Sequence, residues 1–197
     1  MSIRTEGAGT KGEILPFPLG EKEPGTAAGA DLNRGKLGMV IEGPNGRKFR
    51  LVQYVEATSL TGAFQAGANV AGARCFAVAT GDLDDPLTQH HVTRAQRTGA
   101  KPLNRVIGVA LKDQRDLVQY DYFWLQFDGD YIDMFLGDDG TDIAVGDYVA
   151  LDDDADLGNI YGLSTTFTVE FLLGVAMDAN TGVDGVIRVR PVKALNG

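Results

Sequence analysis

One short phrase occurs twice in this chain of 197 residues. Residues 105–111 and 171–177 each contain two hydrophobic residues, then Gly-Val-Ala, then another hydrophobic residue. Each copy is followed by a polar turn and a second strand-like run, at 122–127 and 185–190. Hydrophobic runs of this length joined by turns are typical of β-hairpins. The repeat therefore predicts a β-protein with two related layers around one core. It indicates a structural protein rather than a nucleotide-binding scaffold or a catalytic triad.

Similar short runs continue along the chain from residue 37. Asn45-Gly46, a strong hairpin signal, joins the runs at 37–42 and 49–55, and further runs lie at 74–80, 131–136, 143–151 and 160–162. Turns at intervals of about 8–12 residues favour a barrel or a sandwich. We expect an all-β domain over residues 37–197, a small β-barrel or sandwich of short antiparallel strands. One barrel and two packed sheets both stay open. Residues 90–101 form the one plausible helix, of one or two turns.

Residues 1–36 differ from the rest, because they hold seven glycines and three of the seven prolines. Such a composition buries too little apolar surface to offset the entropy of ordering, so we expect a long extended N-terminal arm. One apolar patch interrupts it, formed by Ile14, Leu15, Phe17 and Leu19. We expect this patch to dock on a neighbouring surface, and a simple disordered tail is the alternative.

The net charge of −9 is unevenly distributed. Residues 128–156 hold eleven aspartates and neither lysine nor arginine, so nucleic acid is an unfavourable partner for that face. We interpret the block as a solvated surface. No apolar run is long enough for a membrane span, and residues 1–7 lack the apolar core of a signal peptide. We therefore expect a soluble protein without nucleic-acid or membrane partners.

No residue pattern predicts catalysis, a cofactor or a metal. His90 and His91 are adjacent, so neither a strand nor a helix directs both at one ion, and we expect surface histidines. The single cysteine, Cys75, excludes an internal disulfide, and the alternation around it predicts a small core residue.

The acidic run at 152–159 invites a calcium interpretation. An EF-hand loop starting at Asp152 needs glycine at its sixth position and glutamate at its twelfth, where the chain has Leu157 and Leu163. A solvated loop is the preferred interpretation, and weak calcium binding is the alternative.

A basic strip and an aromatic cluster are the remaining candidate surfaces. The strip, free of acids from residue 92 to 112, consists of Arg94, Arg97, Lys101, Arg105 and Lys112. It predicts docking on an acidic surface, either of a neighbouring subunit or of another protein, and an ordinary exposed loop is the alternative. The aromatic residues between 120 and 131 lack nearby cations, so we expect a barrel core or a subunit interface rather than base stacking.

Several phrases, in order, resemble the small β-rich decoration (cement) proteins of tailed-phage heads. Residues 43–53 are similar to the early hairpin of that family, and residues 106–111 followed by 122–127 resemble its "Gly-Val-Ala … Tyr-Gly-Trp-Val-Gln" pair. Residues 144–149 match "Ala-x-Gly-Asp-x-Val", and 173–176 with 186–189 resemble the closing hairpin. The resemblance covers about residues 37–192. The chain departs from it at Phe123, where the family often has glycine, and in its acidic middle.

The resemblance implies a non-enzymatic virion protein on the capsid exterior, made in the host cytoplasm. Such a protein binds the major capsid protein, associates with itself as a homotrimer and cements neighbouring capsid proteins. The arm would supply capsid contacts through its apolar patch. Two alternatives stay open: another virion component, such as a head fibre base or a tail protein, and a small ligand-binding β-barrel.

Overall fold

The structure is a computed structural model, and it describes residues 36–62, 69–79, 88–95, 97–98, 101–102, 106–137, 142–152, 158, 160–163, 172–181, 185–192 and 195. The fold is all-β, as expected. Short 3-10 turns lie at Pro44–Gly46 and Thr88–His90. The strands are β1 (Val40–Glu42), β2 (Lys48–Tyr54), β3 (Cys75–Val78), β4 (His91–Arg94), β5 (Arg97–Thr98), β6 (Lys101–Pro102), β7 (Val106–Ala110), β8 (Tyr122–Asp128), β9 (Ile132–Leu136), β10 (Tyr148–Leu151), β11 (Ile160–Leu163), β12 (Leu172–Ala176) and β13 (Gly185–Pro191).

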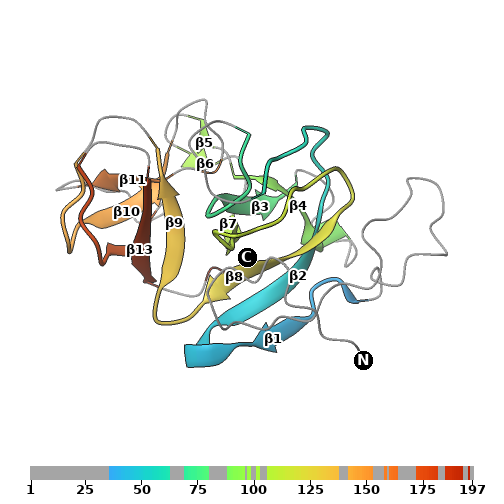
Figure 1. Ribbon diagram of the computed structural model, residues 1–197, viewed down its shortest axis with the longest axis horizontal. Helices are drawn as coiled ribbons and strands as arrows, with labels where there is room; N and C mark the ends of the chain where they lie inside the picture. Colours follow the sequence, from blue (N-terminus) through green and yellow to red (C-terminus); the bar gives the residue numbers. More distant parts are fainter. Residues whose placement is uncertain are drawn as a thin grey trace.

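The strands form two closed rings that lie side by side along the long axis of the molecule (Figure 1). In the first, which we call the N-terminal barrel, β2 pairs with both β4 and β8 and so closes the order β2-β4-β3-β7-β8. Strand β1 pairs with the first residues of β2, on the edge where β4 pairs only with the last two. The second, the C-terminal barrel, has the order β10-β11-β9-β13-β12, and β5 and β6 form a separate small hairpin.

The two barrels have the same topology. Taken in chain order, β2, β3, β4, β7 and β8 correspond to β9, β10, β11, β12 and β13. Each ring contains one parallel pair, between its first and third strands, and four antiparallel pairs. The chain is therefore one five-stranded barrel repeated.

The correspondence extends to register and irregularities. Phe76 lies opposite Gly108 and Val149 lies opposite Gly174, and in both barrels the register shifts after this pair. The turns that enter β3 and β10 also match: the residue two positions before each strand has a positive φ, at Ala73 and at Gly146. Both copies of Gly-Val-Ala lie at equivalent places, in β7 and β12. The repeated phrase is thus the most visible trace of the duplication in the sequence.

Each barrel has a hydrophobic interior. The C-terminal barrel also packs against the outer side of the N-terminal barrel. Val52, Phe76 and Leu125 belong to the first core. The second core contains Met134 and Val189 of the C-terminal barrel, and it includes outward-facing residues of β3 and β7, namely Cys75 and Val109. Backbone bonds reinforce the contact: the Phe135 N–H donates to the Ala73 carbonyl at 2.8 Å and the Leu195 N–H donates to the Phe127 carbonyl at 2.7 Å.

Local expectations are confirmed where neighbouring strands pair. Asn45 and Gly46 both adopt the left-handed conformation in the turn between β1 and β2, with φ of 60° and 68°. The repeated hairpins exist as β7–β8 and β12–β13. The alternatives of one barrel or two packed sheets resolve into two closed rings. Residues 1–35 of the expected arm lie outside the described residues.

The helix expected over residues 90–101 is wrong. The described part of this stretch forms the end of a 3-10 turn and the strands β4, β5 and β6. Strand β4 alternates between half-buried and buried side chains, and it pairs with β2 on one side and β3 on the other. Two neighbours that offer backbone hydrogen bonds outweigh a weak helical pattern.

Candidate functional site

Groups of three or more histidine, cysteine or acidic side chains able to hold a metal do not occur among the described residues. Cys75 is fully buried, as expected, and burial raises the pKa of its thiol to about 12. A thiol in this state is inert. The run at 153–157 lies outside the described residues, and Asp152 next to it is buried rather than solvated.

His90 is partly buried rather than fully on the surface. A Cβ atom on Gly38 would lie 2.1 Å from its Nε2, so the ring fills the space that a side chain there would need. Burial lowers the pKa of His90, and the positive charge of Arg50 and the neighbouring His91 lower it further. The ring therefore serves as a neutral packing surface for the segment that enters β1.

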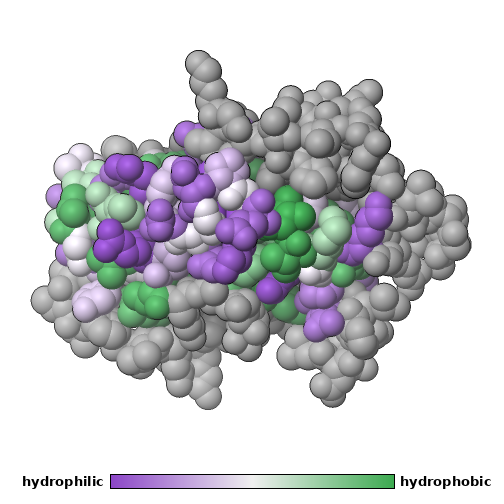
Figure 2. All heavy atoms as spheres, turned by 90° about the horizontal axis from the view of Figure 1, so that it is seen from below, coloured by the Kyte–Doolittle hydropathy of each residue, from purple (hydrophilic) through white to green (hydrophobic). Residues whose placement is uncertain are grey.

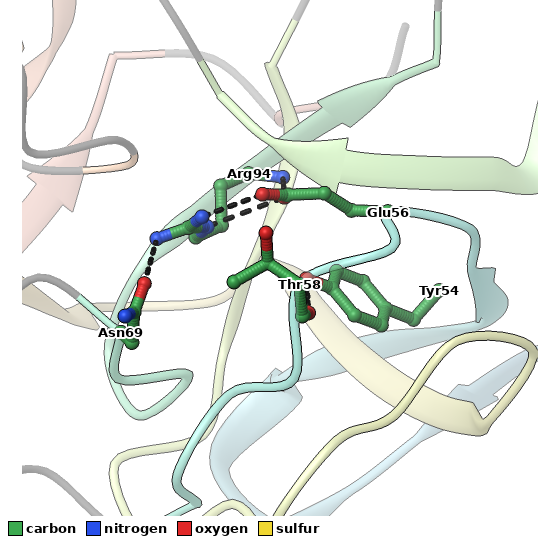
Figure 3. Close-up of polar contacts among 5 residues, drawn as sticks. All are labelled: Tyr54, Glu56, Thr58, Asn69 and Arg94. Carbon is green, nitrogen blue, oxygen red and sulfur yellow. Dashed lines mark hydrogen bonds and ion pairs between the residues drawn. The ribbon is translucent and has the colours of Figure 1, made fainter.

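The best-defined polar constellation surrounds Arg94 at the end of β4 (Figure 3). Its guanidinium donates to both carboxylate oxygens of Glu56, at 3.2 Å and 2.5 Å, and its backbone N–H donates to the same side chain. The Arg94 side chain is only 6% exposed and that of Glu56 19%. Close by, the Tyr54 hydroxyl donates to the Thr58 carbonyl at 2.6 Å. These contacts fasten the loop after β2 to β4, and they contain no group arranged to attack a substrate.

The residues expected to dock are only partly described. Ile14, Leu15, Phe17 and Leu19 lie outside the described residues, as does Arg105. Arg97 and Lys101 lie in the β5–β6 hairpin, where Arg97 is opposite Pro102 and Lys101 is opposite Thr98. Docking through Arg94 would require breaking its ion pair with Glu56. The strip of like charge in the sequence is therefore not one continuous exposed surface.

The aromatic cluster divides between two sides of β8. Phe123 lies inside the N-terminal barrel, edge-on to Phe76 with 5.1 Å between ring centroids. Tyr122 and Trp124 lie on the outer side with Phe49, under Leu37 and Ile41. The expectation of a core is confirmed for these buried rings.

A second polar cluster lies where the two barrels join. Asp133 of β9 is opposite Arg188 of β13. Burial raises the pKa of Asp133, against the opposing influence of Lys112, Arg47 and Arg188. Tyr131 lies between two guanidinium groups, 5.6 Å from that of Arg47 and 5.8 Å from that of Arg188.

The raised pKa of Asp133 predicts a pH-dependent effect on stability. The folded protein binds the proton of this carboxyl more tightly than the unfolded chain, so the ionised form opposes folding above the folded-state pKa and the penalty disappears as the pH falls. Asp133→Asn should therefore raise the urea midpoint at pH 7 but give no advantage near the pKa of an unfolded aspartate. Asp130→Asn at a nearby exposed position is the control. Equal midpoints for Asp133→Asn and the parent at pH 7 would contradict this expectation.

Exposed apolar side chains are concentrated on two surfaces. Met39 and Val40 form the first, which we call the β1 strip. Figure 2 shows the side of the molecule on which β1 lies, and an apolar patch stands out there beside a polar surface. The second lies on the C-terminal barrel and includes Val145, Tyr148 and Val192. Sequence alternation alone could not identify either, because which face is covered depends on distant strands.

None of the helical segments among the described residues is long and apolar enough to cross a membrane. Comparison with known proteins adds a distant likeness. No protein-family model and no curated protein sequence matches the chain. The solved structure of the head fiber gp8.5 N base in bacteriophage phi29 is similar to it, with 14% identity and a TM-score of 0.44 over 74% of this chain and 96% of that chain. Values this low do not assign a function.

Proposed function

We propose that this chain is a structural virion protein that binds the outer surface of a phage capsid and cements neighbouring major capsid proteins, without catalysis. One observation carries the proposal. The phrases that resemble decoration proteins fall on three hairpins of the fold, β1–β2, β7–β8 and β12–β13, and on the turn that enters β10. A chance scatter of short phrases would not follow the hairpins in this way.

The physical character of the described residues suits a static binding role. Two closed barrels leave few free strand edges, which limits unwanted pairing with other chains. The largely buried ion pair between Arg94 and Glu56 and the core shared by the two barrels stabilise the structure. The arm, through Ile14, Leu15, Phe17 and Leu19, would add main-chain and apolar contacts to the shell. Repetition over many equivalent sites makes a modest affinity at each site sufficient.

The test is co-sedimentation of the purified protein with expanded heads that lack decoration. Saturable binding is expected, and it should be lost on deletion of residues 1–36 while the barrels stay folded. A full-length variant with serine at the four apolar arm positions is the matched control, because it keeps the length of the arm. Binding that survives both changes would contradict the role of the arm.

A head fibre base is the second candidate. It predicts the same binding to heads but not the same mechanical effect. A cementing protein should raise the temperature at which heads release their DNA, whereas a fibre base should bind without changing it. Binding with no gain in heat resistance would favour the fibre base. No binding by a folded protein would favour the ligand-binding barrel.

A further inference from the structure

The duplication gives each surface position of one barrel a counterpart on the other. Across the outside of the N-terminal barrel, Cys75, Val109 and Gln126 form one cross-strand row over β3, β7 and β8. The same pairings in the C-terminal barrel align Tyr148, Val175 and Arg190 over β10, β12 and β13. The two rows are equivalent in position and can be compared directly.

Their burial is opposite. Cys75, Val109 and Gln126 are buried, and the first two belong to the core shared with the C-terminal barrel. The row is thus covered because another barrel of the same fold packs on it. On the C-terminal barrel the counterpart row is open, with Tyr148 and Arg190 exposed and Val175 partly buried.

Two further apolar residues flank the open row. Val145, in the turn just before β10, is 67% exposed, and Val192 follows Arg190 by two residues. We call Val145, Tyr148, Val175, Arg190 and Val192 the outer face. Apolar side chains gathered on an exposed surface indicate an interaction site rather than a core.

The part of the C-terminal barrel that packs on the buried row also has an equivalent position on the N-terminal barrel. Within the chain, Gly158 lies against the N-terminal barrel: its N–H donates to Ala95 and its carbonyl accepts from Cys75, both at 2.8 Å. The position equivalent to Gly158 on the N-terminal barrel is His90, because Val92 and Ile160 occupy the same place in the parallel pairs. His90 is covered by Gly38, immediately before the β1 strip. A second copy could pack on the outer face in the way that the C-terminal barrel packs on the N-terminal barrel within the chain. In that arrangement its β1 strip would lie at the contact.

We infer that the outer face binds the β1 strip of a second copy of this chain, head to tail. The two surfaces hold five of the six exposed large apolar side chains among the described residues, so the contact would bury nearly all of them. This contact deepens the proposed function and rests on it, because it adds a contact between copies to the proposed contact with the capsid.

A head-to-tail contact leaves one free surface of each kind on every pair of copies. It therefore continues until a ring closes, as in a trimer, or extends as a filament. A face-to-face dimer, by contrast, would use only one kind of surface. This difference makes the inference testable without a capsid.

The experiment is sedimentation equilibrium of the full chain and three variants. Tyr148→Asp alters the outer face, and Val40→Asp alters the β1 strip. Tyr120→Asp is the matched control, because Tyr120 has the same 37% exposure as Tyr148 but lies on neither surface. The parent and the control should assemble beyond two copies. Each of the other two variants should weaken assembly at least about tenfold, as expected for residues at the centre of an interface. Met39→Asp replaces Val40→Asp if thermal unfolding shows that the latter disturbs β1.

A mixture of the two interface variants gives the sharpest result. The Tyr148→Asp protein keeps an intact β1 strip and the Val40→Asp protein an intact outer face, so a one-to-one mixture should form a dimer and nothing larger. A parent that stays monomeric, a control as weak as Tyr148→Asp, or a mixture that stays monomeric would each overturn the inference. If a monomeric parent still binds heads, the self-association fails while the proposed capsid binding stands.

Discussion

Glu56→Ala is expected to lower the free energy of unfolding by about 3 kcal/mol or more, the cost typical of removing one partner from a buried ion pair. Glu56 accepts three hydrogen bonds from Arg94, whose side chain is almost completely enclosed. The alanine removes the carboxylate that accepts these three hydrogen bonds (Figure 3), next to a guanidinium that is only 6% exposed. Urea unfolding followed by the fluorescence of the single tryptophan, Trp124 in the same barrel, is the measurement.

Two controls test whether the loss of stability comes from the buried charge or from the loss of any ion pair. Lys48→Ala breaks a pair with Asp128 that is much more exposed than Arg94–Glu56, and only a small change in stability is expected there. Glu56→Leu combined with Arg94→Met removes both charges and should recover much of the loss, because replacing a buried pair by apolar residues is often nearly neutral. A Glu56→Ala variant as stable as Lys48→Ala would contradict the assigned role of the ion pair.

Gly174→Ala is expected to lower the free energy of unfolding by about 2–3 kcal/mol, the cost of overpacking a site that has no room. A Cβ atom there would lie 2.4 Å from the Arg190 carbonyl oxygen and 2.4 Å from Val189 Cγ1. The first is backbone of the paired strand, so β12 and β13 would have to move apart. Urea unfolding measured by far-ultraviolet circular dichroism tests the prediction.

The duplication supplies a graded series for this experiment. Gly108, the equivalent residue in β7, would place its Cβ 2.7 Å from Leu125 Cβ and 3.0 Å from the Gln126 carbonyl oxygen, so Gly108→Ala should cost less than Gly174→Ala. Gly46→Ala meets no atom within 4 Å and carries only the strain of its positive φ, about 1 kcal/mol. The order Gly174, Gly108, Gly46 is expected, and a smaller loss at Gly174 than at Gly46 would contradict it.

The Gly-Val-Ala phrase also shows how far the sequence reveals the duplication. The glycine is kept in both copies because the partner strand comes too close for a side chain, so this position is tightly constrained. Elsewhere the counterparts differ chemically: Cys75 corresponds to Tyr148, and Arg94 corresponds to Gly162. Backbone pairing tolerates such changes, and the other strands therefore carry no visible repeat.

By itself, the sequence determined what neighbouring residues decide: an all-β fold, the Asn45-Gly46 turn and the two repeated hairpins, because a turn sets the register of the strands beside it. Only the tertiary structure decided what joins distant segments. The parallel pairs that close each ring, the strand at β4 in place of a helix, and the burial of Leu60 and Val70 all depend on strands far along the chain. The same reason explains why the row of Cys75, Val109 and Gln126 is buried whereas the equivalent row of Tyr148, Val175 and Arg190 is largely exposed. The C-terminal barrel packs on the first row, and no described part of the chain packs in the same way on the second.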